Sequence, residues 1–203
     1  DLVSASLFME RFRDAPETPA AGVLKLQMAC AAALNARPED GTVLALLRTF
    51  HAELLKKSAD SGLQMTAIAG LSALAQGKDP EALETLLEVL SSPGAYDTQV
   101  LVAAVDAISY VGNRAALDEF LPLLHLVGGK QGREKAIGDH LLKRVQGLIK
   151  AEGVGGLAWA LGRLERRAYQ EDNPEYFSSC RKLLEEPELR GLLLPRSSAD
   201  LPV

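Results

Sequence analysis

A ladder of apolar residues recurs four times along this chain, at intervals of 37 to 40 residues. In its clearest copy, one run covers positions 68–74 and a second run covers 83–90, with a turn between them. Spacings of three and four residues within each run are typical of amphipathic helices. A period of this length indicates tandem helix pairs that stack, because a single pair cannot bury both of its apolar faces. The ladder positions are Met28, Ala31, Leu34, Val43, Leu46, Leu47 and Phe50; Ile68, Leu71, Leu74, Leu83, Leu86, Leu87 and Leu90; Val105, Ile108, Val111, Leu117, Phe120, Leu121 and Leu124; and Leu142, Val145, Leu148, Val154, Leu157, Ala158 and Leu161.

The composition agrees with a helical chain that has a substantial core. Apolar residues make up 47% of the 203 residues and aromatic residues 5%, and β-branched residues form none of the short alternating runs that strands require. We therefore predict an all-α fold. The predicted helices cover 3–13, 20–36, 41–57, 62–76, 80–91, 96–111, 114–127, 132–151, 154–168 and 174–186.

The stretch QGKDPEAL at positions 76–83 admits two interpretations. It could be a functional loop that offers a lysine and two carboxylates, or it could be the joint between two helices. The second interpretation explains more: Asp79 stands where an N-cap acceptor belongs, Pro80 at the first helical position, and Glu81 at the positive end of the helix dipole. The same order of residue types recurs at 173–175, as Asn-Pro-Glu.

Two helix pairs carry a resemblance to a known family. The segments MTAIAGLSALAQGKDPEALETLLEVL and LVAAVDAISYVGNRAALDEFLPLL resemble HEAT repeats, with a small-residue-rich first helix, a short turn and a leucine-rich second helix. The resemblance implies a right-handed α-solenoid of about four antiparallel helix pairs with extra terminal helices. The arginine often found in the second helix of such repeats has no consistent equivalent here, and the fourth pair is glycine-rich between its helices. Armadillo-type and other α-solenoids therefore stay open.

The predicted organisation follows from the repeats. Residues 20–168 form the array, flanked by an N-terminal helix and linker at 1–19, a C-terminal capping helix at 169–191 and a tail at 192–203. The four helix pairs of the array cover about 20–58, 62–91, 96–127 and 132–168.

Motifs for catalysis or metal binding are missing from the sequence, which contains no HExxH, CxxC or GxSxG. We expect His51, His125 and His140 to be half-buried or surface residues without a metal, and we predict no catalytic residue, cofactor or metal site. Cys30 and Cys180 are interpreted as free thiols, Cys30 in a buried helical run, with a disulfide or a reactive thiol as the alternatives. The glycine-rich stretch at 128–133 could hold a phosphate at a helix start, but it lacks P-loop spacing and is interpreted as a loop between repeats.

Charge is distributed unevenly along the array. Residues 79–119 hold eight acidic residues against one basic residue, a net charge of −7, whereas residues 130–170 hold nine basic against four acidic residues, a net charge of +5. The two blocks either solvate exposed faces or orient a partner through complementary potentials. As candidate protein-binding residues we single out Glu81, Glu84, Glu88, Arg144, Arg163, Arg166 and Arg167.

The function expected from these patterns is that of a non-enzymatic scaffold or adaptor, which binds another protein or peptide along the solenoid surface. One alternative is a HEAT-like DNA-base glycosylase or nucleic-acid-binding module, which would use the basic C-terminal half with Trp159 or Tyr169 beside the base. The net charge of −5 disfavours it, since phosphate neutralisation supplies most nucleic-acid affinity. A chromophore-lyase-like chaperone is a third possibility. No apolar run is long enough to span a membrane, and the cysteine usage suits the cytoplasm.

Overall fold

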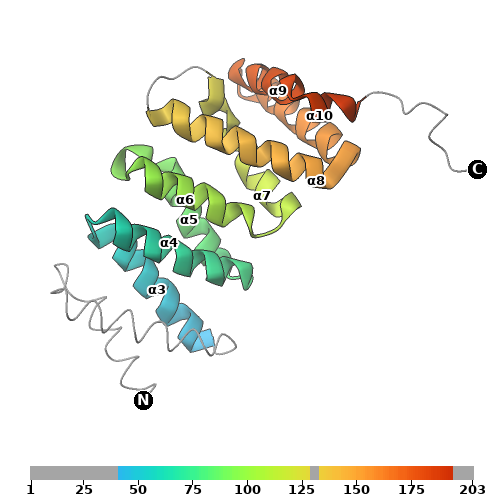
Figure 1. Ribbon diagram of the computed structural model, residues 1–203. Helices are drawn as coiled ribbons and strands as arrows, with labels where there is room; N and C mark the ends of the chain where they lie inside the picture. The colour runs from blue at the N-terminus through green and yellow to red at the C-terminus, as the bar shows by residue number, and fades with distance from the viewer. Residues whose placement is uncertain (1–40, 129–132, 194–203) are drawn as a thin grey trace, which may run out of the picture. The chain divides into compact units, whose positions relative to one another are not determined.

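The structure is a computed structural model of the 203-residue chain, and it describes residues 41–128 and 133–193. Every regular element in these ranges is a helix, and no strand occurs among them, so the predicted all-α class is confirmed (Figure 1). The predicted helices at 3–13 and 20–36 lie outside the described residues, and the second of these is the first helix of the first repeat pair. Most of the 128–133 stretch and nearly all of the tail also lie outside them.

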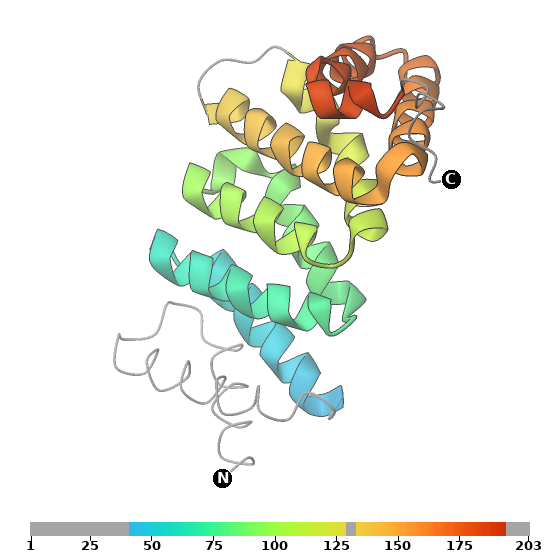
Figure 2. The same ribbon diagram turned by 45° about the vertical axis from the view of Figure 1, so that its right-hand side comes forward.

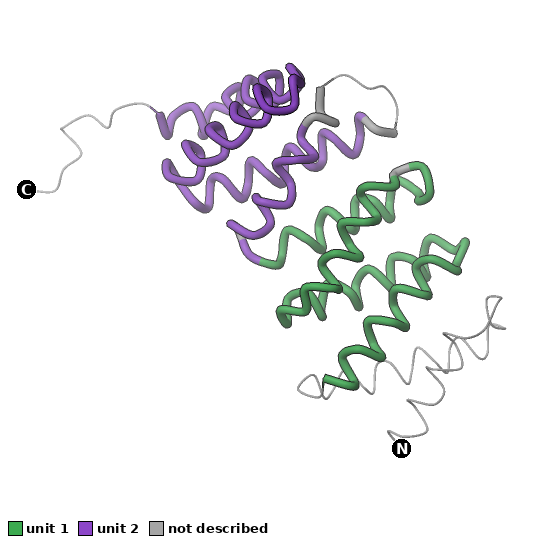
Figure 3. Tube along the Cα trace, turned by 180° about the vertical axis from the view of Figure 1, so that it is seen from behind, with its two compact units in different colours: residues 1–111 green, residues 112–203 purple. Residues whose placement is uncertain are grey.

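The chain divides into two compact units, residues 1–111 and 112–203 (Figure 3). The boundary falls between the two helices of the pair predicted at 96–127. Each unit has its own buried core.

Unit 1 contains α3 (Gly41–Lys57), α4 (Ser61–Gln76), α5 (Pro80–Ser91), a short 3₁₀ turn η1 (Pro93–Ala95) and α6 (Thr98–Ser109). These bounds lie within two residues of the predicted helices. Helix α4 contacts α3, α5 and α6, so it is the central element of the unit. It can pack on three sides because apolar residues occupy most of its surface. Its buried residues include the predicted ladder positions Ile68, Leu71 and Leu74.

The α4–α5 joint shows why QGKDPEAL has its residue types. Lys78 has a φ of 70°, and the chain reverses there with two bonds that close the end of α4: the Lys78 N–H donates to Ala75 O at 2.9 Å and the Asp79 N–H to Leu74 O at 3.1 Å. This pattern is a Schellman motif. The Asp79 side chain then accepts from the N–H groups of Glu81 and Ala82, at 3.1 and 3.2 Å, and caps α5 as predicted.

Unit 2 contains α7 (Asn113–Phe120), the 3₁₀ segment η2 (Leu121–Gly128), α8 (Arg133–Gln170), α9 (Glu175–Glu185) and α10 (Pro187–Gly191). The single α-helix predicted at 114–127 is therefore wrong in its second half. Pro122 supplies the reason, because proline lacks the N–H that an α-helix interior needs and its ring crowds the preceding turn. The α-helix ends at Phe120 instead.

A kink at Gly153 divides α8 (Figure 2). Gly153 has a φ of 70° and a ψ of −154°, and the two halves run in different directions. They correspond to the helices predicted at 132–151 and 154–168. The predicted ladder of the second half is right at Leu157, which is buried, but wrong at Val154, which is 51% exposed, and at Ala158, which is also exposed. The kink resets the helical phase, so that the second half buries Leu157, Ala160, Leu164 and Ala168.

Helix α9 is held against η2 by two side-chain hydrogen bonds. The Tyr176 hydroxyl donates to Pro122 O at 2.9 Å, and the Ser179 hydroxyl donates to Leu124 O at 2.7 Å. Both side chains belong to buried residues. Both accepting carbonyls lie within η2, so the two bonds fix α9 to this segment.

Candidate functional site

The predicted acidic residues Glu81, Glu84 and Glu88 lie on one face of α5, at spacings of three and four residues. Two of the three already have basic partners within unit 1. Arg48 of α3 contacts Glu81, with Nη2 and Oε2 2.9 Å apart, and Lys56 of α3 contacts Glu88, with Nζ and Oε2 3.9 Å apart. Glu84 is exposed and makes no ion pair or hydrogen bond with any residue that the structure describes.

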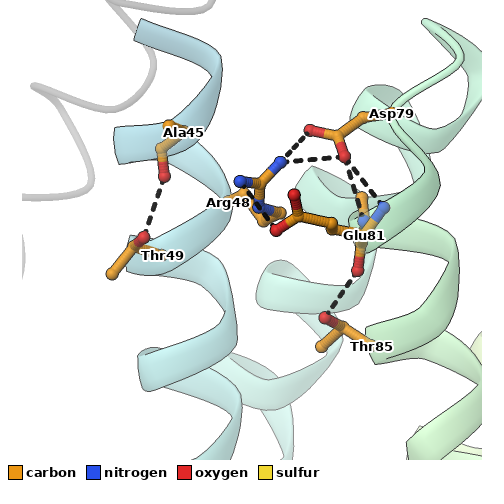
Figure 4. A network of polar contacts seen from close by, with 7 residues as sticks. Ala45, Arg48, Thr49, Asp79, Glu81 and Thr85 are labelled. Carbon is orange, nitrogen blue, oxygen red and sulfur yellow. Dashed lines mark hydrogen bonds and ion pairs between the residues drawn. The ribbon is translucent and has the colours of Figure 1, made fainter. Parts of the chain in front are cut away.

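Arg48 is the centre of the tighter of these contacts (Figure 4). Its Nη1 lies 3.0 and 2.8 Å from the two carboxylate oxygens of Asp79, which also caps α5. The side chains of Arg48 and Asp79 are 22% and 8% exposed, so water screens this pair far less than the exposed Lys56–Glu88 pair. One arginine thereby links α3 to the start of α5.

Sequence reasoning missed Arg48 and Lys56 as partners of the acidic block, because both lie outside residues 79–119. Their spacing of eight residues places them on one face of α3, and the sequence shows that much. That this face lies opposite the glutamates of α5 depends on how the helices pack.

A pocket of about 490 Å³ opens beside the Arg48 network. Leu44 and Leu74 are among its apolar lining residues, and Lys78 lies on its polar side. Arg48, Asp79 and Glu81 also line it, but they already satisfy one another. Three of the charged side chains that line the pocket thus hold α3 and α5 together, and its described lining residues include no nucleophile–base pair.

The predicted basic residues are spread over α8. Arg144 is half-buried in its first half. In the second half, Arg163 is paired with Asp118 at 3.2 Å, and Arg167 is paired with Glu171 one helical turn further on. Arg166 is exposed and has no ion-pair or hydrogen-bond partner among the residues described. Only Arg166 of this trio thus presents an uncompensated charge to solvent.

Trp159, also on the second half of α8, lies close to two arginines. The guanidinium carbon of Arg114, on α7, is 4.2 Å from the centre of the Trp159 ring system, and that of Arg163 is 5.3 Å away. Both distances are within the range of cation–π attraction. Arg114 was not singled out from the sequence, since 45 positions separate it from Trp159. Tyr169, the other aromatic residue considered, is 73% exposed and packs edge-on against Phe177.

The prediction that His51 is half-buried or exposed is wrong. Its side chain is only 6% exposed, and neither ring nitrogen has a hydrogen-bond partner among the residues that the structure describes. The ring occupies the space left by Gly70 on α4, where the Cβ of any larger residue would overlap the imidazole atoms. Burial lowers the pKa of His51 from 6.5 to about 4, so the ring is neutral at physiological pH. His140 is half-buried, as expected, and the side chain of His125 is not among those described.

The cysteines and the possible metal ligands are the remaining candidates for chemistry in the described part of the chain. Cys180 is a half-buried free thiol, and burial, followed by the charge of Glu165, raises its pKa, which disfavours the reactive thiolate. Cys30 lies outside the described residues. No group of three or more His, Cys, Asp or Glu side chains is placed to hold a metal within 41–128 and 133–193.

None of the helices in these ranges is both long and apolar enough to cross a membrane. Comparison with protein-family models, with curated proteins and with solved structures finds no match for the chain.

Proposed function

We propose that this protein is a non-enzymatic adaptor, a HEAT-like right-handed α-solenoid that binds another protein through charged side chains on exposed helix faces. The observation that carries the proposal is that Glu84 and Arg166 are exposed and have no ion-pair or hydrogen-bond partner among the described residues. Each belongs to a predicted charge block, and each lies on a helix whose opposite face is buried. Such groups can meet opposite charges on a partner without first breaking an internal contact.

The buried ladder supports the helix-pair arrangement within this proposal. Ile68, Leu71 and Leu74 of α4, with Leu86 and Leu90 of α5, are buried at the predicted positions. Leu117, Phe120, Leu121 and Leu124 are likewise buried in unit 2. Helices that bury one face in this repeating manner keep the other face available for binding.

The test is quantitative affinity capture with the full chain as bait, comparing wild type with Glu84→Lys and Arg166→Glu. Neither change breaks an ion pair made by the described residues, so both leave the fold intact. Arg181→Glu and Glu185→Lys, at exposed positions on α9, are the matched controls. We expect at least one protein to be lost from the Glu84→Lys or Arg166→Glu bait and retained by both controls.

A capture profile that is identical for all five baits would overturn the proposed function. The same purified proteins can be assayed for retention of duplex DNA on filters. Because the chain carries a net charge of −5, we expect no salt-sensitive retention. Strong, salt-sensitive retention that Arg166→Glu abolishes would favour the nucleic-acid-binding function instead.

A further inference from the structure

The exposed face of α8 around Trp159 has the composition of a binding hot spot. Positions 155, 159, 162, 163 and 166 follow one another at helical spacing on one side of the helix, and they hold glycine, tryptophan, glycine and two arginines. Tryptophan and arginine are among the residue types most enriched at binding hot spots. We name the set Arg114, Trp159, Arg163 and Arg166 the tryptophan–arginine face.

Arg114 and Arg163 differ in their ion-pair and hydrogen-bond partners. Both guanidinium groups lie close to Trp159, but Arg163 also bonds Asp118, whereas Arg114 makes no ion pair or hydrogen bond with any described residue. A guanidinium that stacks on an aromatic ring uses its face and leaves its N–H edge free. Trp159 thus holds the Arg114 guanidinium in place, while its N–H donors have no partner among the described residues.

Holding the guanidinium in place matters for affinity. An arginine on a solvated helix loses side-chain freedom when it binds a ligand, and this loss opposes binding. Stacking on Trp159 restricts Arg114 beforehand, so less freedom remains to be lost. The planar fork matches the two oxygens of a carboxylate.

The surface beside Trp159 is also open. A methyl group added at Gly155 or Gly162 would meet no neighbouring side chain or helix within 4 Å in the described part of the chain. Both glycines are exposed. A peptide backbone can therefore approach α8 on either side of the Trp159 ring.

From these contacts we infer that the tryptophan–arginine face binds an acidic peptide segment, with Arg114 holding a carboxylate and Arg166 supplying a second positive charge. The inference rests on the proposed function and names the partner's chemistry. A peptide fits better than nucleic acid, because Arg114 covers the Trp159 ring on which a base would stack. Asp118 also neutralises Arg163, so the face offers few free charges to a run of phosphates.

Trp159 reports on this face directly, because it is the only tryptophan in the chain. Its fluorescence can be followed in the full chain while a glutamate-rich peptide without aromatic residues is added. We expect a saturable change in Trp159 emission that weakens as salt is raised. A glutamine-rich peptide of the same length should cause no change.

Variants of Arg114 separate the contribution of the guanidinium's paired N–H donors to peptide binding from that of its positive charge. Arg114→Gln is expected to weaken binding of the glutamate-rich peptide about tenfold, and Arg114→Lys to weaken it by several-fold, because lysine keeps the charge and loses the fork. Arg181→Gln, which removes one exposed arginine from α9, is the matched control and should bind as wild type does.

Three outcomes would overturn the inference: no saturable change in emission, equal binding by Arg114→Gln and Arg181→Gln, or tighter binding of single-stranded oligothymidylate than of the peptide. These failures are distinguishable from failure of the proposed function. If the peptide tests fail while Arg166→Glu still abolishes partner capture, the adaptor function stands and only the assignment of an acidic peptide to this face is lost.

Discussion

His51 is a polar side chain in an apolar setting. Its ring extends from α3 against Gly70 of α4 and lies 5.2 Å from the ring of Phe50, in an edge-to-face arrangement. Both nitrogens are buried and make no hydrogen bond within the described part of the chain. Charging the ring would place an unpaired cation in this contact, and this cost is the physical cause of its low pKa.

The titration of His51 predicts how stability depends on pH. The unfolded chain binds a proton at this residue below about pH 6.5, whereas the folded chain does so only below about pH 4, so the free energy of unfolding decreases as pH falls between these values. The full loss is about 3 kcal/mol. Chemical denaturation at several pH values should show this loss in wild type and a smaller one in His51→Leu.

All other ionisable groups are common to wild type and His51→Leu, so subtracting one pH profile of the unfolding free energy from the other removes their contribution. If the profiles of wild type and His51→Leu are parallel from pH 7 to pH 4, His51 is not the group responsible.

At the scale of single elements, the chain uses one kind of helix joint twice. At the α4–α5 joint Lys78 takes a positive φ, and at the α8–α9 joint Asp172 does so, with a φ of 46°. In each case the following residue donates its N–H five residues back, Asp79 to Leu74 O and Asn173 to Ala168 O. Its side chain then accepts the N–H group of the glutamate two residues further on. Pro80 is the first residue of α5, whereas Pro174 directly precedes α9.

Asp79 has two roles in its joint, and two substitutions should separate them. Asp79→Asn keeps an oxygen that can cap α5 and removes the charge that faces Arg48, whereas Asp79→Ala removes both. We expect Asp79→Ala to lower the free energy of unfolding by about 2–3 kcal/mol and Asp79→Asn by about 1 kcal/mol. Urea denaturation measures both values.

The exposed Asp60 cap of α4 is a useful comparison. It accepts from the N–H groups of Gly62 and Leu63 and makes no ion pair among the residues described. Asp60→Ala should therefore cost only the capping contribution, about 1 kcal/mol. An Asp79→Ala variant no less stable than Asp60→Ala would show that the Arg48 contact contributes nothing.

At the scale of the whole molecule, two separate cores are the main feature. Leu71 in unit 1 and Leu183 in unit 2 are each fully buried within their own unit. Units that bury their own apolar surface can open as separate cooperative groups in hydrogen exchange.

Truncation of each core should therefore act within its own unit. Leu71→Ala is expected to cost about 2–5 kcal/mol and to speed amide exchange in α4 and α6, with little change in α9. Leu183→Ala is the reciprocal control, and it should speed exchange in α9 and leave α4 unchanged. Hydrogen exchange followed by mass spectrometry resolves these segments. Equal acceleration in both units by either variant would contradict independent opening.

Local signals in the sequence were sufficient to predict most described helices. The bounds of α5 were predicted without error, because the Asp79-Pro80 pair marks where this helix begins. The capping role of Asp79 was also readable, since it depends on the next three residues alone. Where the helix and ladder predictions failed, the cause was still local: Pro122 and Gly153 interrupt leucine-rich runs that otherwise continue in register.

The sequence by itself determined the helical class, the α4–α5 joint and the segments in which charge of one sign is concentrated. Only the tertiary structure decided which charges remain available, because that depends on which helix lies opposite. Arg48 and Lys56 meet the glutamates of α5 across a helix contact, and Arg114 reaches Trp159 from another helix. Glu84 and Arg166 lack such partners among the described residues for the same reason, and they carry the proposed function.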